Sequence, residues 1–174
     1  AYDSVRIQAV QHALNGIPLE IVTLEDPGGA HAGNWFLKNG PDDMVSGGDD
    51  IIFEPTCLER MTATEGDVVI PEGAPEVPEG ARTINPAACW LIRQSCAAKI
   101  GYWDEAIAPQ YHYFDDSDYI RRMTLAGIAH TVAKGAHAIH VNGGSQTYRS
   151  YTPSQMEEHQ RRFAIAQGNY VRKW

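Results

Sequence analysis

Two acidic clusters are the residues of this sequence best suited to chemistry. The first is Asp49-Asp50, which follows Gly47-Gly48 at the end of a predicted strand. Carboxylate oxygens are hard ligands that suit Mg²⁺ or Mn²⁺, and such an ion in turn binds a diphosphate. The pair therefore predicts a metal site at a strand end. A solvated acidic turn is the alternative for an Asp-Asp pair taken alone.

The second cluster, Asp115-Asp116-Ser117-Asp118, follows the aromatic run Tyr111-His112-Tyr113-Phe114. Carboxylates at a helix N-terminus are stabilised by the helix dipole, so a helix cap is the simplest interpretation. One cap needs only one carboxylate, however, and three crowded carboxylates repel each other. An aromatic wall that limits water would favour one of them as a general base. Both interpretations stay open.

Three further positions are weaker candidates. His140 lies in the apolar run 138–141, where a histidine is most often structural, although an imidazole beside carboxylates is a good manganese ligand. Gly28-Gly29 and Asn34 predict a backbone turn near a ligand. They do not form a known phosphate loop, because neither the GxGxxG pattern nor a GK[ST] ending is present.

Alternating helices and strands are predicted to position these groups. Helices are expected at 3–14, 30–38, 116–125 and from Thr152 onward, and strands at 19–24, 44–46, 131–133 and 138–141. Short Gly-rich joints between them favour an α/β domain with a mostly parallel sheet. Prolines and glutamates alternate through 65–82, which predicts a connecting loop or an edge segment.

The last predicted helix has a clear start. Thr152-Pro153-Ser154-Gln155 combines an N-cap residue, Pro at the first helical position and Gln three residues after the cap. Met156, Phe163 and Tyr170 then recur every seven residues. This spacing predicts one apolar stripe that packs on the core.

Composition limits the class of protein. The 174 residues suit one domain spanning 1–174, and the net charge of -8 argues against binding to a nucleic-acid backbone. No stretch approaches the ~20 apolar residues of a membrane span, and the start lacks a signal pattern, so we expect a cytoplasmic protein. The three cysteines lack CxxC spacing, which predicts buried, inert thiols in a reducing compartment.

Taken in order, these motifs resemble family 2 glycosyltransferases of the GT-A fold over residues 19–174. Six segments carry the resemblance: Gly28-Gly29 with Asn34, Asp49-Asp50 with Pro55, Ile100-Gly101-Tyr102-Trp103-Asp104-Glu105, Tyr113-Phe114-Asp115-Asp116-Ser117-Asp118 with Arg121-Arg122, Ile139-His140 with Ser145 and Thr147, and Asn169 through Lys173-Trp174. The resemblance implies a GT-A-like, Rossmann-like fold with a mostly parallel sheet flanked by helices. No counterpart of the family's first strands precedes Ala1, so this fold is expected to be N-terminally shortened.

The resemblance also implies an activity and a role for each residue. The activity is transfer of a sugar, with inversion, from a nucleoside-diphosphate donor to a carbohydrate or other hydroxyl acceptor. The implied metal is Mn²⁺ or Mg²⁺, held by Asp49, Asp50 and His140. Asp116 is the implied catalytic base, with Asp115 as its neighbour. The implied donor-side residues are Glu25, Asp26, Gly28, Gly29 and Asn34, and the implied acceptor-side residues are Trp103, Asp104, Glu105 and Asp118.

Two other functions stay open. A binding domain that is catalytically inactive, or that a partner chain completes, would show no metal-dependent nucleotide binding. A nucleotidyltransferase would also use strand-end carboxylates with a metal, but it would release pyrophosphate from a nucleoside triphosphate. Self-association is a further expectation, because an incomplete sheet edge favours pairing between copies.

Overall fold

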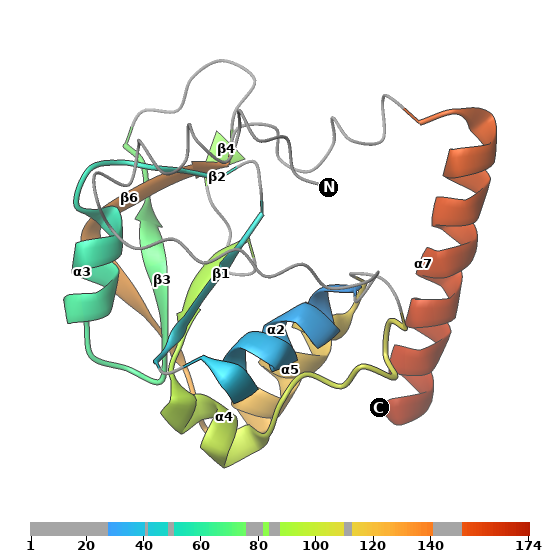
Figure 1. The fold of residues 1–174 in the computed structure, drawn as a ribbon, viewed down its shortest axis with the longest axis horizontal. Helices are drawn as coiled ribbons and strands as arrows, with labels where there is room; N and C mark the ends of the chain where they lie inside the picture. The colour runs from blue at the N-terminus through green and yellow to red at the C-terminus, as the bar shows by residue number, and fades with distance from the viewer. Residues whose placement is uncertain are drawn as a thin grey trace.

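The computed structural model of this protein shows a mixed sheet with helices on both faces (Figure 1). It describes residues 28–40, 42–48, 51–75, 82–83, 88–109, 113–140 and 151–174. The helices are α2 (Gly28–Asn39), α3 (Cys57–Ala63), α4 (Gln94–Ile100), α5 (Asp115–Leu125) and α7 (Pro153–Lys173). The strands are β1 (Met44–Gly47), β2 (Ile51–Phe53), β3 (Val68–Gly73), β4 (Arg82–Thr83), β5 (Cys89–Ile92) and β6 (His130–His140).

The sheet is not the mostly parallel, Rossmann-like sheet expected from the sequence. Its order is β1-β5-β3-β6-β2, with β4 also paired to β6. Within the described strands only β3 and β6 are parallel, and every other pair is antiparallel. The expectation fails because α3 joins β2 to β3, and α4 and α5 lie between β5 and β6, yet neither pair of strands is adjacent in the sheet. The helices therefore do not form crossovers between neighbouring parallel strands.

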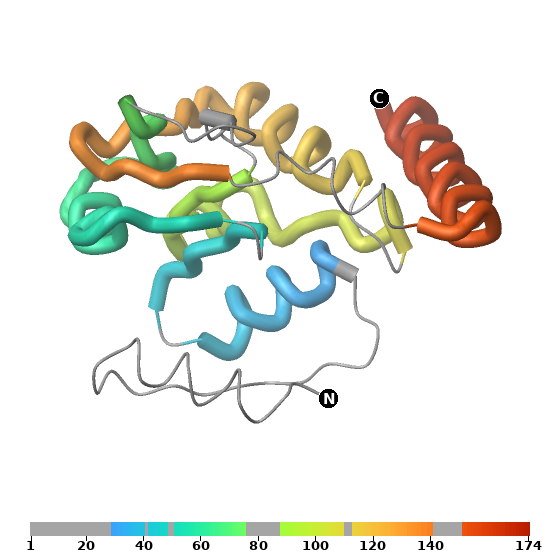
Figure 2. The backbone as a smooth tube through the Cα atoms, turned by 90° about the horizontal axis from the view of Figure 1, so that it is seen from above, coloured from blue at the N-terminus to red at the C-terminus, as the bar shows by residue number. Residues whose placement is uncertain are grey.

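Two apolar clusters cover the two faces of the sheet. Alternate residues of a strand point to opposite faces, so Val68 and Ile70 join one cluster while Val69 joins the other. The larger cluster packs the sheet against α2, α4 and α5, and the smaller one packs it against α3. Both views of the chain place α3 and α7 at opposite ends of the molecule (Figures 1 and 2).

The prediction of a connecting loop or an edge segment at 65–82 is wrong for residues 68–73, which form strand β3. Val68–Gly73 is a central strand with β5 on one side and β6 on the other. It tolerates Pro71 because the register shifts there, with Pro71 opposite Ala133 and Glu72 opposite His137. Gly135, at φ 69°, allows the bulge in β6, and its backbone N–H donates to the Glu72 carboxylate over 2.8 Å.

Several elements confirm the sequence-based predictions. The helix at 30–38 is α2, the strand at 44–46 is β1 and the helix at 116–125 is α5. The two strands expected at 131–133 and 138–141 form one continuous strand, β6. The helix and strand expected at 3–14 and 19–24 lie outside the described residues.

The last helix begins as predicted. Thr152 accepts from the backbone N–H of Gln155, whose side chain accepts in return from the Thr152 backbone N–H, and Pro153 follows the cap. None of the helices described here is long and apolar enough to span a membrane.

The three cysteines are free and buried, as predicted. Burial raises the pKa of Cys57 to about 11 and that of Cys89 to about 12. A thiol with so high a pKa is a poor nucleophile at neutral pH, which supports the prediction of inert thiols.

Candidate functional site

A pocket of about 340 Å³ gathers three of the sequence motifs. Its lining comes from the start of α2, the end of β1, the start of β5, the segment before α5 and the first turn of α5. The lining residues are Gly29, Gly33, Ser46, Gly47, Gly48, Ala88, Trp90, Trp103, Asp115 and Asp116. The glycine motif and the acidic helix start, far apart in the sequence, therefore face the same space.

The structure describes His140, one of the three predicted metal ligands, and the residue directly before the other two. Gly48 lines the pocket, and the next two residues, Asp49 and Asp50, lie outside the described residues. His140 is the last residue of β6 and is paired with Ile51, which directly follows Asp50. Backbone pairing thus brings His140 to the point where the chain leaves the acidic pair. No cluster of three or more His, Cys, Asp or Glu side chains suited to a metal occurs among the described residues.

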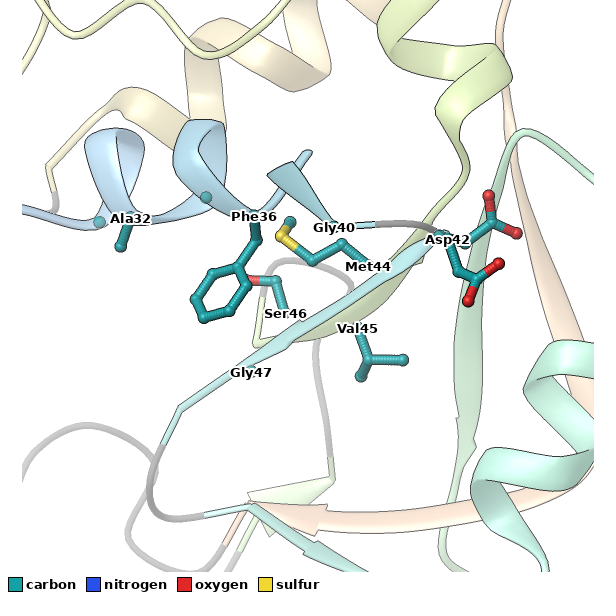
Figure 3. A pocket seen from close by; sticks show the side chains of 11 residues that line it. Ala32, Phe36, Gly40, Asp42, Met44, Val45, Ser46 and Gly47 are labelled. Carbon is teal, nitrogen blue, oxygen red and sulfur yellow. The ribbon is translucent and has the colours of Figure 1, made fainter. Parts of the chain in front are cut away.

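A larger cavity of about 600 Å³ lies between α2 and β1. It shares Gly29, Gly33, Ser46 and Gly47 with the smaller pocket, so the two cavities adjoin and together make up one hollow side of the molecule, called the hollow below. Figure 3 shows Met44 pointing from β1 toward α2, and the ring of Phe36 lying between α2 and the strand. Phe36 is 44% exposed. The hollow therefore offers both an apolar wall and a polar end at Asp115 and Asp116.

Asn34, expected on the donor side, holds the segment before α5 in place. Its side chain is buried, donates to the Trp103 carbonyl over 2.9 Å and accepts from the Trp103 backbone N–H over 2.8 Å. It also donates to Glu105 over 2.8 Å. Gly28 and Gly29, expected as a turn, are instead the first residues of α2. Glu25 and Asp26, also expected on the donor side, lie outside the described residues.

Trp103, expected on the acceptor side, is both a core residue and part of the pocket wall. Its ring stacks on Tyr119, with ring centroids 4.6 Å apart, and it is 7% exposed. A Cβ atom at Gly33 would lie 2.8 Å from the Trp103 ring. The indole can therefore occupy this place only because position 33 carries no side chain.

Asp104 is held by an ion pair, and Glu105 is held by hydrogen bonds. Asp104 pairs with Lys173 over 2.8 Å, and this hydrogen bond lowers the pKa of the Asp104 carboxyl. Glu105 accepts from Asn34 and pairs with His31 over 2.9 Å, and these hydrogen bonds lower the pKa of Glu105. Both carboxylates fix the segment that carries Trp103.

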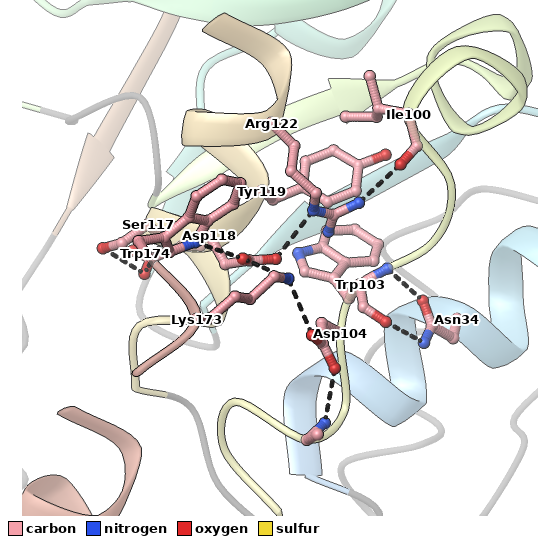
Figure 4. Close-up of polar contacts among 12 residues, drawn as sticks. Asn34, Ile100, Trp103, Asp104, Ser117, Asp118, Tyr119, Arg122, Lys173 and Trp174 are labelled. Atoms are coloured by element: carbon pink, nitrogen blue, oxygen red, sulfur yellow. Dashed lines mark hydrogen bonds and ion pairs between the residues drawn. The ribbon is translucent and has the colours of Figure 1, made fainter. Parts of the chain in front are cut away.

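Asp118, also expected on the acceptor side, is fully buried and links α5 to the end of α7 (Figure 4). Its carboxylate accepts from Arg122 over 2.9 Å, from Lys173 over 2.6 Å and from the indole of Trp174 over 2.9 Å. The end of α7 is thus bound to the first turns of α5. In this arrangement Asp118 acts on the pocket by positioning the helix that carries Asp115 and Asp116.

The backbone just before the acidic cluster is strained. Phe114 has φ 64° and ψ 0°, a left-handed conformation that costs a bulky residue free energy. Its ring packs on Phe163 and Tyr170 of α7, with ring centroids 5.1 and 5.6 Å apart. These contacts of α7 stabilise the turn that delivers Asp115 and Asp116 to the pocket.

Asp116 lines the pocket and uses only one of its two carboxylate oxygens in hydrogen bonds within the described residues. One oxygen, Oδ1, accepts from the backbone N–H of Ser117 over 2.6 Å and from its hydroxyl over 3.2 Å. The second oxygen, Oδ2, has no hydrogen-bond partner within the described part of the chain. A carboxylate oriented through one oxygen and open at the other suits a general base.

Arg122 and Lys173 were named from the sequence only within motifs of the family resemblance, and their role in supporting this site from a distance was not predicted. Arg122 and Lys173 bind the buried Asp118, yet a basic residue in a helix is usually a solvated surface group. The signals that could have found them are the spacing of Asp118 and Arg122, four residues apart, and the apolar stripe of the last helix.

Comparisons with known proteins add no relative. No protein-family profile matches the chain, and neither a characterised protein sequence nor a solved structure is significantly similar to it.

Proposed function

We propose that this chain is a metal-dependent, inverting glycosyltransferase that moves a sugar from a nucleoside-diphosphate donor to an acceptor hydroxyl. One observation carries the proposal: Asp116, open at Oδ2, lines the same pocket as Gly48, the residue directly before Asp49-Asp50. A base in the pocket, together with a metal bound by the acidic pair that directly follows a pocket residue in the sequence, would meet the two needs of this reaction, which are an activated nucleophile and a stabilised leaving group.

The chemistry assigned to Asp116 is the removal of one proton. Its Oδ2 accepts the proton of the acceptor hydroxyl while the hydroxyl oxygen bonds to the anomeric carbon of the donor sugar. The bond from that carbon to the diphosphate oxygen breaks, and its electron pair leaves with the diphosphate. Because the attack comes from the face opposite the leaving group, the anomeric configuration inverts. Ser117 keeps the carboxylate oriented through Oδ1.

The residues available for a metal fit a hard divalent cation. Asp49 and Asp50 supply carboxylates, and His140 lies in register with Ile51, beside the chain that leaves them. Carboxylates with one imidazole suit Mn²⁺ or Mg²⁺. When bound there, such an ion offsets the negative charge that grows on the leaving diphosphate.

Calorimetric titration of the whole chain with UDP and with GDP, with and without Mn²⁺, tests the donor site. We expect binding that requires the metal, disappears in Asp50→Ala and persists in Asp116→Asn. Glu59→Gln, on α3 at the opposite face of the sheet, is the control and should bind like the parent chain. A folded chain that binds neither nucleotide in the presence of Mn²⁺ would contradict the proposal.

Release of nucleoside diphosphate from a panel of UDP- and GDP-sugars tests the catalytic step. Loss of a general base lowers rates by about 10²- to 10⁴-fold, so Asp116→Asn should lower turnover by at least about 100-fold. Glu59→Gln should leave turnover unchanged. Metal-dependent nucleotide binding with no turnover, or with turnover that persists in Asp116→Asn, would contradict the assignment of Asp116 as the catalytic base.

A further inference from the structure

A second polar cavity, of about 480 Å³, lies where the first half of α7 meets the segment before α5. Two tyrosines, Tyr113 and Tyr151, contribute its aromatic surface, and Ser154, Gln155, Glu158, His159 and Arg162 contribute its polar surface. The rings of Tyr113 and Tyr151 both lie edge-on to His159, with centroids 5.3 and 5.9 Å from it, and the Tyr113 hydroxyl lies 2.5 Å from His159 Nδ1. The wall is therefore built from ordered aromatic side chains.

We infer that this cavity binds a neutral pyranose, and that this sugar is the acceptor of the proposed transfer. The role of this sugar as the acceptor rests on the proposed function, whereas the binding of a sugar to the cavity can be measured independently of that function. Aromatic rings cover the apolar C–H face of a pyranose, while side chains with both donors and acceptors bind its hydroxyl groups.

The charges in the cavity favour a neutral ligand over a phosphate. Glu158 and Arg162, the two residues with charged side chains that line the cavity beside His159, form an ion pair with each other. Arg161 also pairs with Glu158 but does not line the cavity. A phosphate site would instead present unbalanced arginines or backbone N–H groups. The Glu158 carboxylate can accept hydrogen bonds from sugar hydroxyl groups, whereas its negative charge repels a phosphate. The Gln155 amide nitrogen makes no hydrogen bond within the described residues.

The position of the cavity favours an acceptor over an unrelated ligand. Tyr113 lines this cavity, and Asp116, three residues later, lines the pocket that holds the proposed base. Three residues span at most about 10 Å, a distance that a disaccharide bridges. A sugar seated against Tyr113 could therefore present its next hydroxyl to Asp116.

Saturation-transfer NMR tests this site directly on the full chain, without nucleotide or metal. The probes are methyl glycosides and disaccharides of glucose, galactose, mannose and N-acetylglucosamine, and inorganic phosphate serves as competitor. We expect at least one neutral sugar to bind. Its affinity should fall by roughly tenfold or more in Tyr151→Ala, which removes an aromatic face, and in Glu158→Gln, which removes the charged acceptor.

Glu157→Gln is the matched control, because Glu157 is an exposed neighbour on the same helix and does not line the cavity. It should bind sugar like the parent chain. Equal affinity in all four proteins, displacement of the sugar by phosphate, or no binding across the panel would overturn the inference. Sugar binding in a chain that binds no nucleotide would uphold the site and reject the transferase. In an active chain, Tyr151→Ala should raise the acceptor KM and leave hydrolysis of the donor unchanged.

Discussion

The ammonium group of Lys173 lies 2.6 Å from Oδ1 of Asp118, a carboxylate with no exposed surface. Lys173 also pairs with Asp104, so one cation bridges α5 and the segment that carries Trp103 (Figure 4). Because Asp115 and Asp116 open α5, this bridge sets the position of the proposed base without touching the pocket. The end of α7 is therefore part of the support of the site.

Replacing Asp118 with Asn should destabilise the fold. The change removes the charge from a buried group and leaves Arg122 and Lys173 without their buried partner, and breaking a buried ion pair costs about 3 to 5 kcal/mol. Both cations keep some solvent contact, so we expect a loss of about 3 kcal/mol in the free energy of unfolding, measured in urea.

Lys134→Met provides the control for Asp118→Asn. Lys134 pairs with Glu72 over 2.9 Å at the surface, where its side chain is 82% exposed. An exposed ion pair contributes at most about 1 kcal/mol. Equal losses in the two variants would mean that Asp118 does not act as a buried anchor.

The contacts around Lys173 should weaken at both extremes of pH. Its hydrogen bond lowers the pKa of Asp104 below the ordinary 3.8, so this contribution is complete above that value and disappears as the pH falls through the native pKa. Burial opposes the charge of Lys173, but its bonds to Asp104 and Asp118 prevail and raise its pKa above 10.5. That contribution is complete below 10.5 and disappears as the pH rises through the native pKa.

Hydrogen exchange at the end of α7, followed by mass spectrometry, measures this pH dependence. Once the intrinsic exchange rates are corrected for pH, protection of the last turn should be constant between about pH 5 and 9 and lower outside that range. Lys173→Met should show lower protection between about pH 5 and 9, and its protection should not fall further outside that range. If protection in Lys173→Met is still higher within that range than outside it, contacts other than those of Lys173 cause the pH dependence.

Gly33→Ala should disturb the pocket through Trp103. The added Cβ would lie 2.8 Å from a rigid indole that itself stacks on Tyr119, so the ring must move. Forcing extra volume into a packed site costs about 1 to 3 kcal/mol. We expect that loss in the free energy of unfolding, measured in urea, together with a shift of the tryptophan emission maximum.

Gly168→Ala is the matched control for Gly33→Ala. Gly168 lies in α7, and its Cβ would meet only the flexible end of Arg172 at 3.4 Å. Alanine is favoured over glycine inside a helix by about 0.5 to 1 kcal/mol, so this variant should be slightly more stable than the parent. Similar destabilisation in both variants would show that Trp103 can move aside at no cost.

Phe114 should prefer Gly to Ala as its replacement. Both changes remove the ring that packs on Phe163 and Tyr170, but only glycine adopts φ 64° without a penalty. We expect the free energy of unfolding, measured in urea, to be higher for Phe114→Gly than for Phe114→Ala by about 1 kcal/mol. The reverse order would mean that the turn before Asp115 relaxes once the ring is gone.

Local patterns in the sequence predicted the helices that carry their own signals. The helix start at Thr152 could be predicted because a capping signal acts over a few residues. The order and direction of the strands in the sheet could not be predicted from such local signals. Its neighbours are set by packing between distant segments, and Val68–Gly73 was obscured by Pro71, which lies at a register shift that the sequence does not announce.

The site was predictable in part for the same reason. The acidic start of α5 and the glycines of α2 are local motifs, and the fold brings Asp116 and Gly33 to one pocket. The conversion of Asp118 into a buried anchor depends on Lys173 and Trp174, which lie more than fifty residues later. No spacing rule connects residues so far apart.

Strand β6 has a consequence for the order in which the protein forms. It is the sole partner of β2 and β4 within the described sheet, and it also pairs with β3. All three precede residue 84, whereas β6 ends at His140. On the ribosome, β2 and β4 must wait until β6 has been made and has left the exit tunnel. Pairing between segments so distant in the chain is slow to form, so the nascent protein carries open strand edges until β6 has emerged.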